Sequence, residues 1–512
     1  MTEDLRALAD DAIASSRAGE DPDYPLVHVA PPVGRLNDPN GLLVDAGTYH
    51  AFYQFTPLHG TRRLVYWGHS SSTDLLHWRH RGVAVVPDSP YDASGAYSGS
   101  ALVLTGAEAG AAPARAPYQL FYTGNLKDPV TDERTASQCL VTSADLDDFA
   151  KWPANPLIAD HAPGYTAHYR DPQVSRDPER PGAYRMLIGV QRADETGAAV
   201  LYRSRDLLTW EPAGEITFPD AGGALDDFGF MWECPGLVTL TDEATGLERD
   251  VLIWCPQGAR PAGAEGYENV FPCVYAVGRL VGTELRECDG AVREVDRGFE
   301  FYAPQAFARR PGEPGPVLLT GWAGNAGQDD QPSIATGGWV HALTAARALS
   351  LRDGRLIQRP APALPDSAPA LGATGSRPAG AARLGELDGH RSWHLVMDIE
   401  ELGEGAWVGL RIGDDSCFVS LCLRRTDAGP QLVVDRSASR YTGRGARRAV
   451  GVPAGAAGRL EVLHDRSITE IFVGDGDLAF TLRSFVAPDS SGAALIADGP
   501  VRLGPVAAVH FD

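Results

Sequence analysis

The chain has 512 residues, a hydrophobic fraction of 44% and a formal net charge of −22 at pH 7. This length exceeds what one hydrophobic core usually organises, so we expect two domains. So acidic a protein has no basic stripe with which to neutralise a phosphodiester backbone or an anionic lipid surface. Nucleic acid and membrane are therefore disfavoured as partners, and a neutral small molecule is favoured.

The first residues of the chain predict a short amphipathic helix between residues 3 and 16, because apolar side chains recur there at helical spacing: Leu5, Leu8, Ala9, Ala12 and Ile13. The segment lacks the basic start and apolar core of a signal peptide. No later run reaches the length of a membrane helix, so we expect a cytoplasmic protein. The seven cysteines are scattered without CxxC spacing, which predicts reduced thiols and no metal site.

From residue 25 onward the chain alternates apolar and polar residues in short runs such as TYHAFYQF and YRMLIGV, separated by Gly, Pro, Asp and Asn. These runs predict many antiparallel strands. The pattern Ser-x-Asp-Leu with a following Trp recurs at residues 72–78, 143–152 and 204–210. Repetition at tens of residues is typical of a β-propeller, in which we expect this pattern to close a turn of each blade.

A Pro-, Ala- and Gly-rich stretch at residues 358–385 predicts a linker. Alternating runs beyond it, including SWHLVMDIE and TEIFVG, predict a β-sandwich. We therefore expect an all-β protein in four parts: an N-terminal helical extension at residues 1–24, a β-propeller at residues 25–357, the linker, and a β-sandwich domain at residues 386–512.

Two carboxyl groups stand in contrasting local sequences, as hydrolysis of a glycosidic bond requires: one ionised carboxylate and one protonated carboxyl. Asp38 lies in the turn sequence NDPNG, where Asn37 and Asn40 offer amide donors that would keep its carboxylate ionised, as a nucleophile needs. Glu233 lies in the apolar stretch FMWECPG, where burial would raise its pKa toward that of an acid/base.

A third carboxyl, that of Asp171, follows Arg170 in HYRDPQV, and the guanidinium would keep it charged. Taken singly, each of the three carboxyls has an ordinary structural explanation: a turn residue, an ion-paired strand end, or a buried group bound by backbone donors. The histidines at positions 50, 69 and 168 are scattered among strands and are assigned no role.

Together and in this order, the segments resemble glycoside hydrolase family 32, which comprises invertases and fructan hydrolases. The family's Asn-Asp-Pro-Asn-Gly, Arg-Asp-Pro and Glu-Cys boxes are matched at residues 37–41, 170–172 and 233–234, and further matches include YWGHS, AYSGSA and HDRSITEIFVGDG. The likeness runs from about residue 28 to the carboxyl terminus. Within the family, the intracellular branch of sucrose-6-phosphate hydrolases and bacterial sucrases is most similar, through segments such as GYTAHYRDP, CPQG and EFYAPQAF.

This resemblance implies a five-bladed β-propeller with the active site in a funnel at its axis, followed by a β-sandwich. It implies that Asp38 attacks the fructosyl anomeric carbon, that Glu233 acts as acid and then base, and that Asp171 stabilises the transition state. Such a reaction retains configuration through a covalent fructosyl-enzyme, places the nucleophile and acid/base carboxyls about 5–5.5 Å apart, and needs no metal or organic cofactor. The residues implied to contact the sugar are Leu36, Asn37, Pro39, Gln54, Trp67, Tyr97, Ser98, Arg170 and Trp322.

We expect sucrose as the substrate, with short fructo-oligosaccharides as further substrates. Three alternatives stay open: a sucrose-6-phosphate hydrolase, a fructosyltransferase and a non-catalytic carbohydrate-binding protein. Arg62 and Arg63 could supply a phosphate site, although exposed surface arginines explain them as well. Arg35 stands where many family members carry Trp, which leaves the aromatic contact at the pocket rim open. The sequence does not indicate the oligomeric state.

Overall fold

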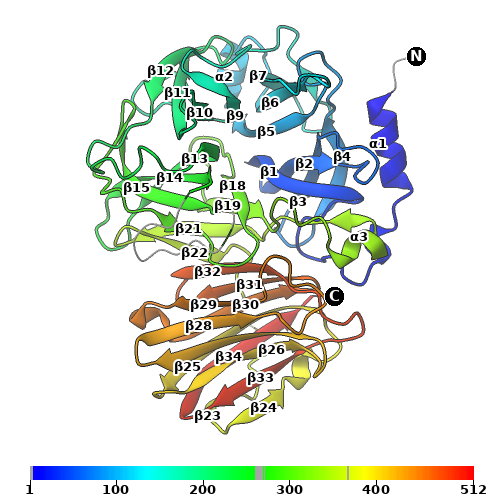
Figure 1. Cartoon of the computed structure of the whole chain (residues 1–512), viewed down its shortest axis with the longest axis vertical. Coiled ribbons are helices and arrows are strands. Elements are labelled where there is room, and N and C mark those ends of the chain that lie inside the picture. The colour runs from blue at the N-terminus through cyan, green and yellow to red at the C-terminus, as the bar shows by residue number, and fades with distance from the viewer. Residues whose placement is uncertain (1–3, 260–268, 270, 366–367, 512) are drawn as a thin grey trace.

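The computed structural model describes residues 4–259, 269, 271–365 and 368–511. Residues 1–3, 366, 367 and 512, which the expected domain boundaries include, lie outside the described residues. Strands dominate both halves of the molecule, with a ring of small sheets above and two stacked sheets below in the view of Figure 1. Within the described ranges no helix has the length and apolar character needed to cross a membrane.

The expected N-terminal helix is confirmed as α1 (Leu5–Ala14). It begins at Asp4, whose side chain accepts hydrogen bonds from the backbone N–H groups of Arg6 and Ala7, as a capping residue does. Ala9 is fully buried, and the helix lies along the outside of the first sheet beside β4 (Figure 1). The helix therefore packs against the outer strand of the first blade.

Five antiparallel sheets form a ring, which confirms the five-bladed β-propeller. Each sheet buries its faces against its neighbours, so its strands are apolar on both faces. The blade strands in chain order are β1 (Gly34–Asp45), β2 (Thr48–Thr56), β3 (Tyr66–Ser72) and β4 (Arg79–Val85); β5 (Ala96–Val103), β6 (Tyr118–Lys127), β7 (Arg134–Ser143) and β8 (Ala150–Lys151); β9 (Tyr165–Arg176), β10 (Tyr184–Arg192), β11 (Gly197–Ser204) and β12 (Glu211–Glu215); β13 (Met231–Thr241), β14 (Glu248–Gln257), β15 (Val274–Val281), β16 (Glu284–Arg286) and β17 (Arg293–Glu294); and β18 (Tyr302–Ala306), β19 (Val317–Trp322), β21 (Arg347–Arg352) and β22 (Arg355–Pro360).

The ring is closed by a short strand that leaves the last blade and joins the first. This strand, β20 (Trp339–Val340), lies between β19 and β21 in the chain but pairs in parallel with the start of β1, Gly34 opposite Trp339. Two short helices, α2 (Gly106–Ala111) and α3 (Pro332–Thr336), and the 3-10 turn η1 (Ala18–Glu20) occupy connections. The pairing of β1 from the first blade with β20 from the last blade holds these two blades together.

The recurring Ser-x-Asp-Leu pattern closes a turn in three blades, as expected. In the copy at residues 204–210, the Ser204 hydroxyl accepts from the Leu207 N–H at 2.8 Å, and the Asp206 carboxylate accepts from the Thr209 N–H at 2.7 Å. Leu207 adopts a left-handed backbone with φ of 67°, and the Trp210 indole donates to its carbonyl at 3.1 Å. The copies at 72–78 and 143–148 repeat the serine and aspartate bonds, so the pattern is structural.

The C-terminal part is a β-sandwich of two six-stranded antiparallel sheets, as predicted. The inward side chains of both sheets form one apolar core that includes Trp393, Leu410 and Val462. In sheet order the strands are β23 (Gly375–Arg377), β34 (Val501–His510), β25 (Ser392–Leu402), β30 (Arg459–Asp465), β31 (Ile468–Val473) and β32 (Leu478–Arg483), facing β24 (Gly380–Arg383), β33 (Ala493–Asp498), β26 (Trp407–Gly413), β27 (Phe418–Thr426), β28 (Gly429–Asp435) and β29 (Arg447–Gly451), with the 3-10 turns η2 (Gly385–Leu387) and η3 (Ala454–Ala456).

The stretch expected to be a linker is partly built into both domains. Its first residues belong to β22, which ends at Pro360, and β23 and β24 are edge strands of the two sandwich sheets. Leu371 and Ala373 are buried in the sandwich core. Edge strands tolerate Pro and Gly, because one side of the strand makes no ladder hydrogen bonds, and for this reason the composition resembled that of a linker.

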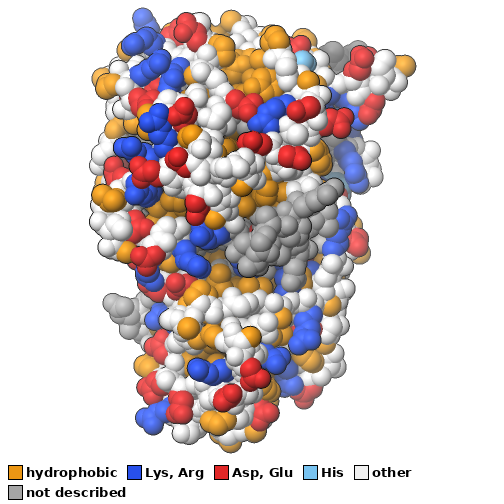
Figure 2. Space-filling model, turned by 60° about the vertical axis from the view of Figure 1, so that its left-hand side comes forward, with side chains coloured by type: hydrophobic (Ala, Val, Ile, Leu, Met, Phe, Trp, Pro, Cys, Tyr) orange, Lys and Arg blue, Asp and Glu red, His pale blue; other side chains and the backbone are white. Residues whose placement is uncertain are grey.

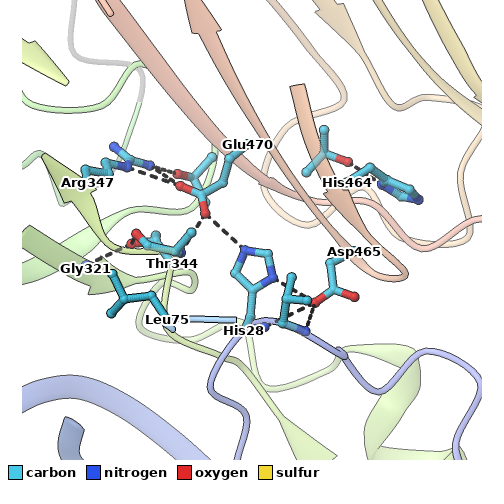
Figure 3. Close-up of polar contacts among 12 residues, drawn as sticks. His28, Leu75, Gly321, Thr344, Arg347, His464, Asp465 and Glu470 are labelled. Carbon is cyan, nitrogen blue, oxygen red and sulfur yellow. Dashed lines mark hydrogen bonds and ion pairs between the residues drawn. The ribbon is translucent and has the colours of Figure 1, made fainter. Parts of the chain in front are cut away.

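A buried polar network joins the propeller to the sandwich (Figure 3). Arg347 in β21 is fully buried and donates to the carboxylates of Glu470 in β31 and Asp296 at 2.6 and 2.9 Å. His28, which precedes the first blade, lies between Glu470 at 3.0 Å and Asp465 at 2.9 Å. Since each buried charge has a charged partner, this contact tolerates the loss of water around it.

The outer surface carries acidic and basic side chains interspersed rather than gathered by sign on the face that Figure 2 shows. This distribution agrees with the absence of a basic stripe in the sequence.

Candidate active site

The candidate site lies where the first strands of the five blades meet at the propeller axis. These strands are β1, β5, β9, β13 and β18, and each is adjacent to the next around the ring (Figure 1). The structure brings together on them the three carboxyls that the sequence singled out: Asp38 on β1, Asp171 on β9 and Glu233 on β13. Residues that are 62 or more positions apart in the chain therefore meet at the axis, because every blade starts there.

Asp38 accepts hydrogen bonds from three side chains. Ser98 donates from its hydroxyl at 2.6 Å and Gln54 from its amide at 3.1 Å, both to Oδ2, while the Asn37 amide donates to Oδ1 at 3.2 Å. Asn40 does not take part: its amide, oriented to suit its neighbours, donates to the carbonyl of Pro39 and accepts from the Gln54 N–H. The expected hydrogen bond from the Asn37 amide to Asp38 is confirmed. The one expected from the Asn40 amide is wrong, because that amide bonds to Pro39 instead.

The pKa of Asp38 is raised, contrary to the expectation. Burial raises it most, the hydrogen bond from Ser98 lowers it, and the negative charge of Glu233 raises it again. The hydrogen bonds from Ser98 and Asn37 thus do not offset the loss of water and the charge of the neighbouring carboxylate. The influence of Glu233 on Asp38 places the two carboxyls within electrostatic reach of each other, while their separation of about 5–5.5 Å stays a prediction.

Glu233 is held by three donors from three other strands. Arg170 donates to Oε1 at 2.6 Å, and Gln257 and Tyr302 donate to Oε2 at 2.6 and 2.5 Å. Burial alone would raise the pKa of this carboxyl, but the charge of Arg170 and these hydrogen bonds outweigh burial, and the pKa is lowered. The prediction that the Glu233 carboxyl lies in apolar surroundings, which raise its pKa, is therefore wrong. Strand alternation turns the Trp232 side chain into the core behind the site and turns Glu233 toward polar groups.

Asp171 is buried, and the pKa of its carboxyl is raised to about 7. Burial is the main cause, and the negative charges of Glu233 and Asp38 add to it against the positive charge of Arg170. The expectation that Arg170 would keep this carboxyl charged is wrong, since the nearest guanidinium contact to Asp171 is 3.9 Å while the ion pair with Glu233 is 2.6 Å. Arg170, although next to Asp171 in sequence, forms its ion pair with Glu233 of the fourth blade.

Cys234 links the two aspartates. Its backbone N–H donates to Asp171 Oδ2 at 3.0 Å, and its thiol lies 3.5 Å from Asp171 Oδ2 and 3.9 Å from Asp38 Oδ2. Asp171 and Cys234 both have left-handed backbones, with φ of 66° and 47°. Non-glycine residues adopt this conformation at a cost that surrounding structure must offset, and such residues cluster at functional sites.

Two of the residues implied to contact the sugar pack in the apolar clusters of the blades. Leu36 and Trp67 are fully buried, and the Trp67 indole donates to the backbone carbonyl of Tyr97 at 3.0 Å. Both side chains point into the blade, because alternate residues of a strand face opposite sides. Trp67 thus supports the strand that carries Tyr97 and Ser98.

The remaining expected residues lie at or beside the three carboxyls. Gln54 and Ser98 bond to each other as well as to Asp38. Pro39 is buried in β1, and Tyr97 is partly exposed. Trp322 is 2% exposed, and the guanidinium of Arg35 lies over its ring at 5.1 Å.

Arg35 occupies the place of the expected rim aromatic and makes three contacts there. It stacks on Trp322, donates to Asp329 Oδ1 at 2.9 Å, and donates to the Asn37 side-chain carbonyl at 2.6 Å. Since the Asn37 oxygen is taken by Arg35, its amide N–H₂ group faces Asp38 and Gln54. Arg35 therefore sets the orientation of an amide that bonds to the candidate nucleophile.

Two functional residues were missed by the sequence interpretation: Gln257 and Tyr302, which bind Glu233. Both lie in segments that carried the family resemblance, CPQG and EFYAPQAF, without an assigned role. Their distance in sequence from Glu233, 24 and 69 residues, gave no local signal of the contact.

The arrangement suits general acid–base and nucleophilic chemistry on a glycosidic bond. Three carboxyls meet at the axis. Glu233 is bound by a guanidinium, an amide and a phenol, and Asp38 and Asp171 both contact the thiol of Cys234. The described part of the chain holds no group of three or more His, Cys, Asp or Glu side chains that could bind a metal ion.

Comparison with known families agrees with this geometry. The model described as the glycosyl hydrolases family 32 N-terminal domain matches residues 28–360, and that of the family 32 C-terminal domain matches residues 404–509. The sucrose-6-phosphate hydrolase of Klebsiella pneumoniae is 38% identical over 472 residues, which cover 91% of this chain and 89% of that protein. That of Salmonella typhimurium is 40% identical over 348 residues, 67% of this chain and 68% of the relative.

Solved structures of similar fold extend over the whole chain. The sucrose-6-phosphate hydrolase from Lactobacillus gasseri has a TM-score of 0.79 and 27% identity, and covers 100% of this chain with 97% of its own. The β-fructofuranosidase BmSUC1 of Bombyx mori has a TM-score of 0.78 and 25% identity, over 100% and 99% of the two chains. A mutant of the Bombyx mori enzyme in complex with sucrose aligns with a TM-score of 0.76 and 25% identity, over 99% and 98%.

Proposed function

The chain belongs to glycosyl hydrolase family 32, and from that premise we propose that it hydrolyses the fructosyl bond of sucrose 6-phosphate, and more slowly that of sucrose. The observation that carries the proposal is the meeting of Asp38, Asp171 and Glu233 at the propeller axis, in a chain similar to sucrose-6-phosphate hydrolases over most of its length. The relatives favour the phosphorylated sugar over the sucrose that the sequence interpretation placed first.

In the proposed first step, the Asp38 carboxylate attacks the anomeric carbon of the fructosyl unit while Glu233 donates its proton to the glycosidic oxygen. The bond to the glucosyl part breaks, and a covalent fructosyl-enzyme forms. In the second step Glu233 takes a proton from water, the water oxygen attacks the same carbon, and Asp38 is released. Configuration is retained over the two steps.

The protonation of the pocket sets which form of the protein reacts. Glu233 raises the pKa of Asp38, and Glu233 and Asp38 both raise that of Asp171, so the three carboxyls titrate as a coupled group. The productive form carries a proton on Glu233 and none on Asp38. The proposed role of Asp171 is to bond to fructosyl hydroxyls, and its pKa of about 7 allows its carboxyl to donate or accept near neutral pH.

The polar contacts around Asp38 support a role in holding the fructosyl unit. Asn37, Gln54 and Ser98 carry amide and hydroxyl groups that suit sugar hydroxyls, and Trp322 with Arg35 forms a flat wall beside them. The small-molecule partner is thus a fructoside. A phosphorylated sugar does not cross a membrane unaided, so the proposal includes a cytoplasmic location, which cell fractionation tests.

The test is product analysis with the purified protein on sucrose, sucrose 6-phosphate, kestose and inulin. We expect free fructose from the first two, with kcat/KM for sucrose 6-phosphate at least tenfold above that for sucrose, and NMR of the first-formed fructose showing the retained anomer. Accumulation of kestose-type oligosaccharides at high sucrose would favour a fructosyltransferase. Release of no sugar from any of the four would favour a non-catalytic carbohydrate-binding protein.

A further inference from the structure

A group of basic side chains lies at the pocket on the side of blades two and three. It consists of Arg134, the first residue of β7, and His168 and Arg170 on β9. Arg134 extends over the ring of Tyr97 on β5, with 5.8 Å between the guanidinium carbon and the ring centroid. Arg170 donates to His168 Nδ1 at 2.8 Å. We call Arg134, His168, Arg170 and Tyr97 the basic corner.

Arg134 is the arginine of the basic corner that forms no ion pair with a described carboxylate. Among the described residues no carboxylate lies within ion-pair distance of it, and its contacts are the Tyr97 ring and the electrostatic influence on His168. By contrast Arg170 is paired with Glu233, and Arg35 on the other side of the pocket is paired with Asp329. In a chain of net charge −22, an unpaired arginine beside the catalytic pocket is suited to an anionic ligand.

His168 offers a second donor toward the same space. A guanidinium can only donate, so the Arg170 contact requires His168 Nδ1 to be the acceptor and places the ring proton on Nε2. Nε2 has no hydrogen-bond partner in the described part of the chain. Burial and the charges of Arg170 and Arg134 lower the pKa of His168 to about 4, so the ring is neutral at pH 7 and its Nε2–H is a donor.

The mechanism determines which part of the substrate meets this corner. Glu233 protonates the leaving oxygen, so the glucosyl part departs on the side of Glu233, while Asp38 and its donors hold the fructosyl part. From Glu233 the contacts lead through Arg170 to His168 and, by electrostatic influence, to Arg134. A phosphate carried by the glucosyl part therefore points toward the basic corner.

One of the two arginines that the sequence interpretation considered for phosphate lies elsewhere. Arg63 influences His59, whose ring lies 3.6 Å from the Asp329 carboxylate that also pairs with Arg35. That group adjoins Asn37 and Asp38, which places it on the side of the nucleophile and the fructosyl unit. A leaving-group phosphate does not face it.

We propose that Arg134 and His168 form the subsite that recognises the phosphate of a phosphorylated glucosyl leaving group. The inference rests on the proposed fructoside hydrolysis and adds to it the residues that select the charged substrate. The Arg134 guanidinium binds two phosphate oxygens in a fork, the His168 Nε2–H donates to one of them, and the Tyr97 ring holds the guanidinium flat.

The test compares kcat/KM for sucrose 6-phosphate and for sucrose in wild-type protein, Arg134→Gln and Arg134→Lys, with Arg63→Gln as a control that removes one charge on the nucleophile side. We expect Arg134→Gln to lower the ratio of the two kcat/KM values at least tenfold, Arg134→Lys to lower it less because a charge remains, and Arg63→Gln to keep it within twofold. His168→Asn should also lower this ratio, and it should lower kcat/KM on sucrose by a smaller factor, because His168 contacts Arg170.

A second measurement uses inhibition of sucrose hydrolysis by glucose 6-phosphate and by glucose. Wild type should be inhibited at least tenfold more strongly by the phosphate, and Arg134→Gln should lose that difference while keeping inhibition by glucose. An unchanged substrate ratio in Arg134→Gln, or a larger loss in Arg63→Gln, would overturn the subsite. If the wild-type protein cleaves both sugars equally well, the phosphate subsite is overturned but the proposed hydrolysis of fructosides is not. If it cleaves neither sugar, the proposed function itself is overturned.

Discussion

Tyr302 Oη donates a hydrogen bond to Glu233 Oε2 at 2.5 Å, across the boundary between the fourth and fifth blades. The phenol stabilises the charged form of the glutamate, and together with Gln257 and Arg170 it holds the pKa of Glu233 down against burial. An acid/base must carry its proton when the leaving group departs, so in the proposed mechanism Tyr302 sets the pH range in which Glu233 can act as an acid.

Tyr302→Phe should therefore move the alkaline limb of the kcat/KM profile to higher pH by about one unit, since a hydrogen bond to a charged group contributes about 1.5–3 kcal/mol. The reason is that loss of the donor raises the pKa of Glu233, and its protonated form persists further. The measurement is kcat/KM on sucrose between pH 4 and 9. Tyr165→Phe, which removes a similar phenol–glutamate bond to Glu215, is the control and should leave the profile in place. A limb that moves to lower pH would contradict the role of Tyr302.

Asp38→Asn and Glu233→Gln should each lower kcat on sucrose by at least about a thousandfold, because general acid catalysis alone supplies about 10²–10⁴. The two variants should differ on a fructosyl fluoride, whose leaving group needs no proton: Glu233→Gln should keep most of the wild-type rate of fructosyl transfer to the enzyme, and Asp38→Asn should not. Asp177→Asn, which removes a buried carboxylate paired with Arg203 on the outer part of a blade, is the control and should retain activity. Circular dichroism checks folding, and equal losses on both substrates would undo the assignment of roles.

The buried network between the domains should make stability depend on pH. His28 lies between Asp465 and Glu470, and although burial disfavours its charge, their hydrogen bonds raise the pKa of the ring to about 9 (Figure 3). A folded-state pKa above the ordinary 6.5 means that the contribution is complete below about pH 6.5 and is lost as pH rises through about 9. The loss should amount to about 3 kcal/mol.

Thermal unfolding between pH 6 and 10 measures this effect. His28→Asn should be less stable than wild type at pH 7 and should lose most of the wild-type pH dependence. His464→Asn is the matched control, because burial lowers the pKa of His464 to about 3 and its ring is neutral throughout this range. If His28→Asn follows the wild-type curve in parallel, the protonated His28 is not the cause.

Arg35→Leu should lower kcat/KM on sucrose about tenfold, since a charge-assisted hydrogen bond that orients a reacting group contributes about 1.5–3 kcal/mol. Without Arg35 the Asn37 amide is free to rotate, and its donor no longer faces Asp38. Arg310→Leu is the control, because Arg310 likewise pairs with an aspartate, Asp45, and stacks on an aromatic ring. Its removal should leave kinetics within twofold, and an equal loss in both variants would indicate a general effect on stability.

The sequence predicted the architecture well because its signals are local. Strand alternation, turn residues and the recurring Ser-x-Asp-Leu pattern each act over a few residues, and the structure shows that pattern closing the turns by bonds within six positions. Residues 358–385 were predicted to be a linker because edge strands and linkers are both rich in Pro and Gly, whereas part of this stretch forms edge strands. Segments 375–377 and 380–383 could be told apart from a linker only by the sheets that they join.

The sequence by itself determined the family, since three short boxes in the right order identify it, and these boxes supplied the three candidate carboxyls. The tertiary structure decided how each carboxyl ionises, and it reversed the direction expected for Asp38, Asp171 and Glu233. The physical reason is that a pKa depends on burial and on charges and donors within a few ångströms. At this propeller axis those neighbours come from other blades, as Arg170 and Tyr302 come to Glu233 from 63 and 69 residues away.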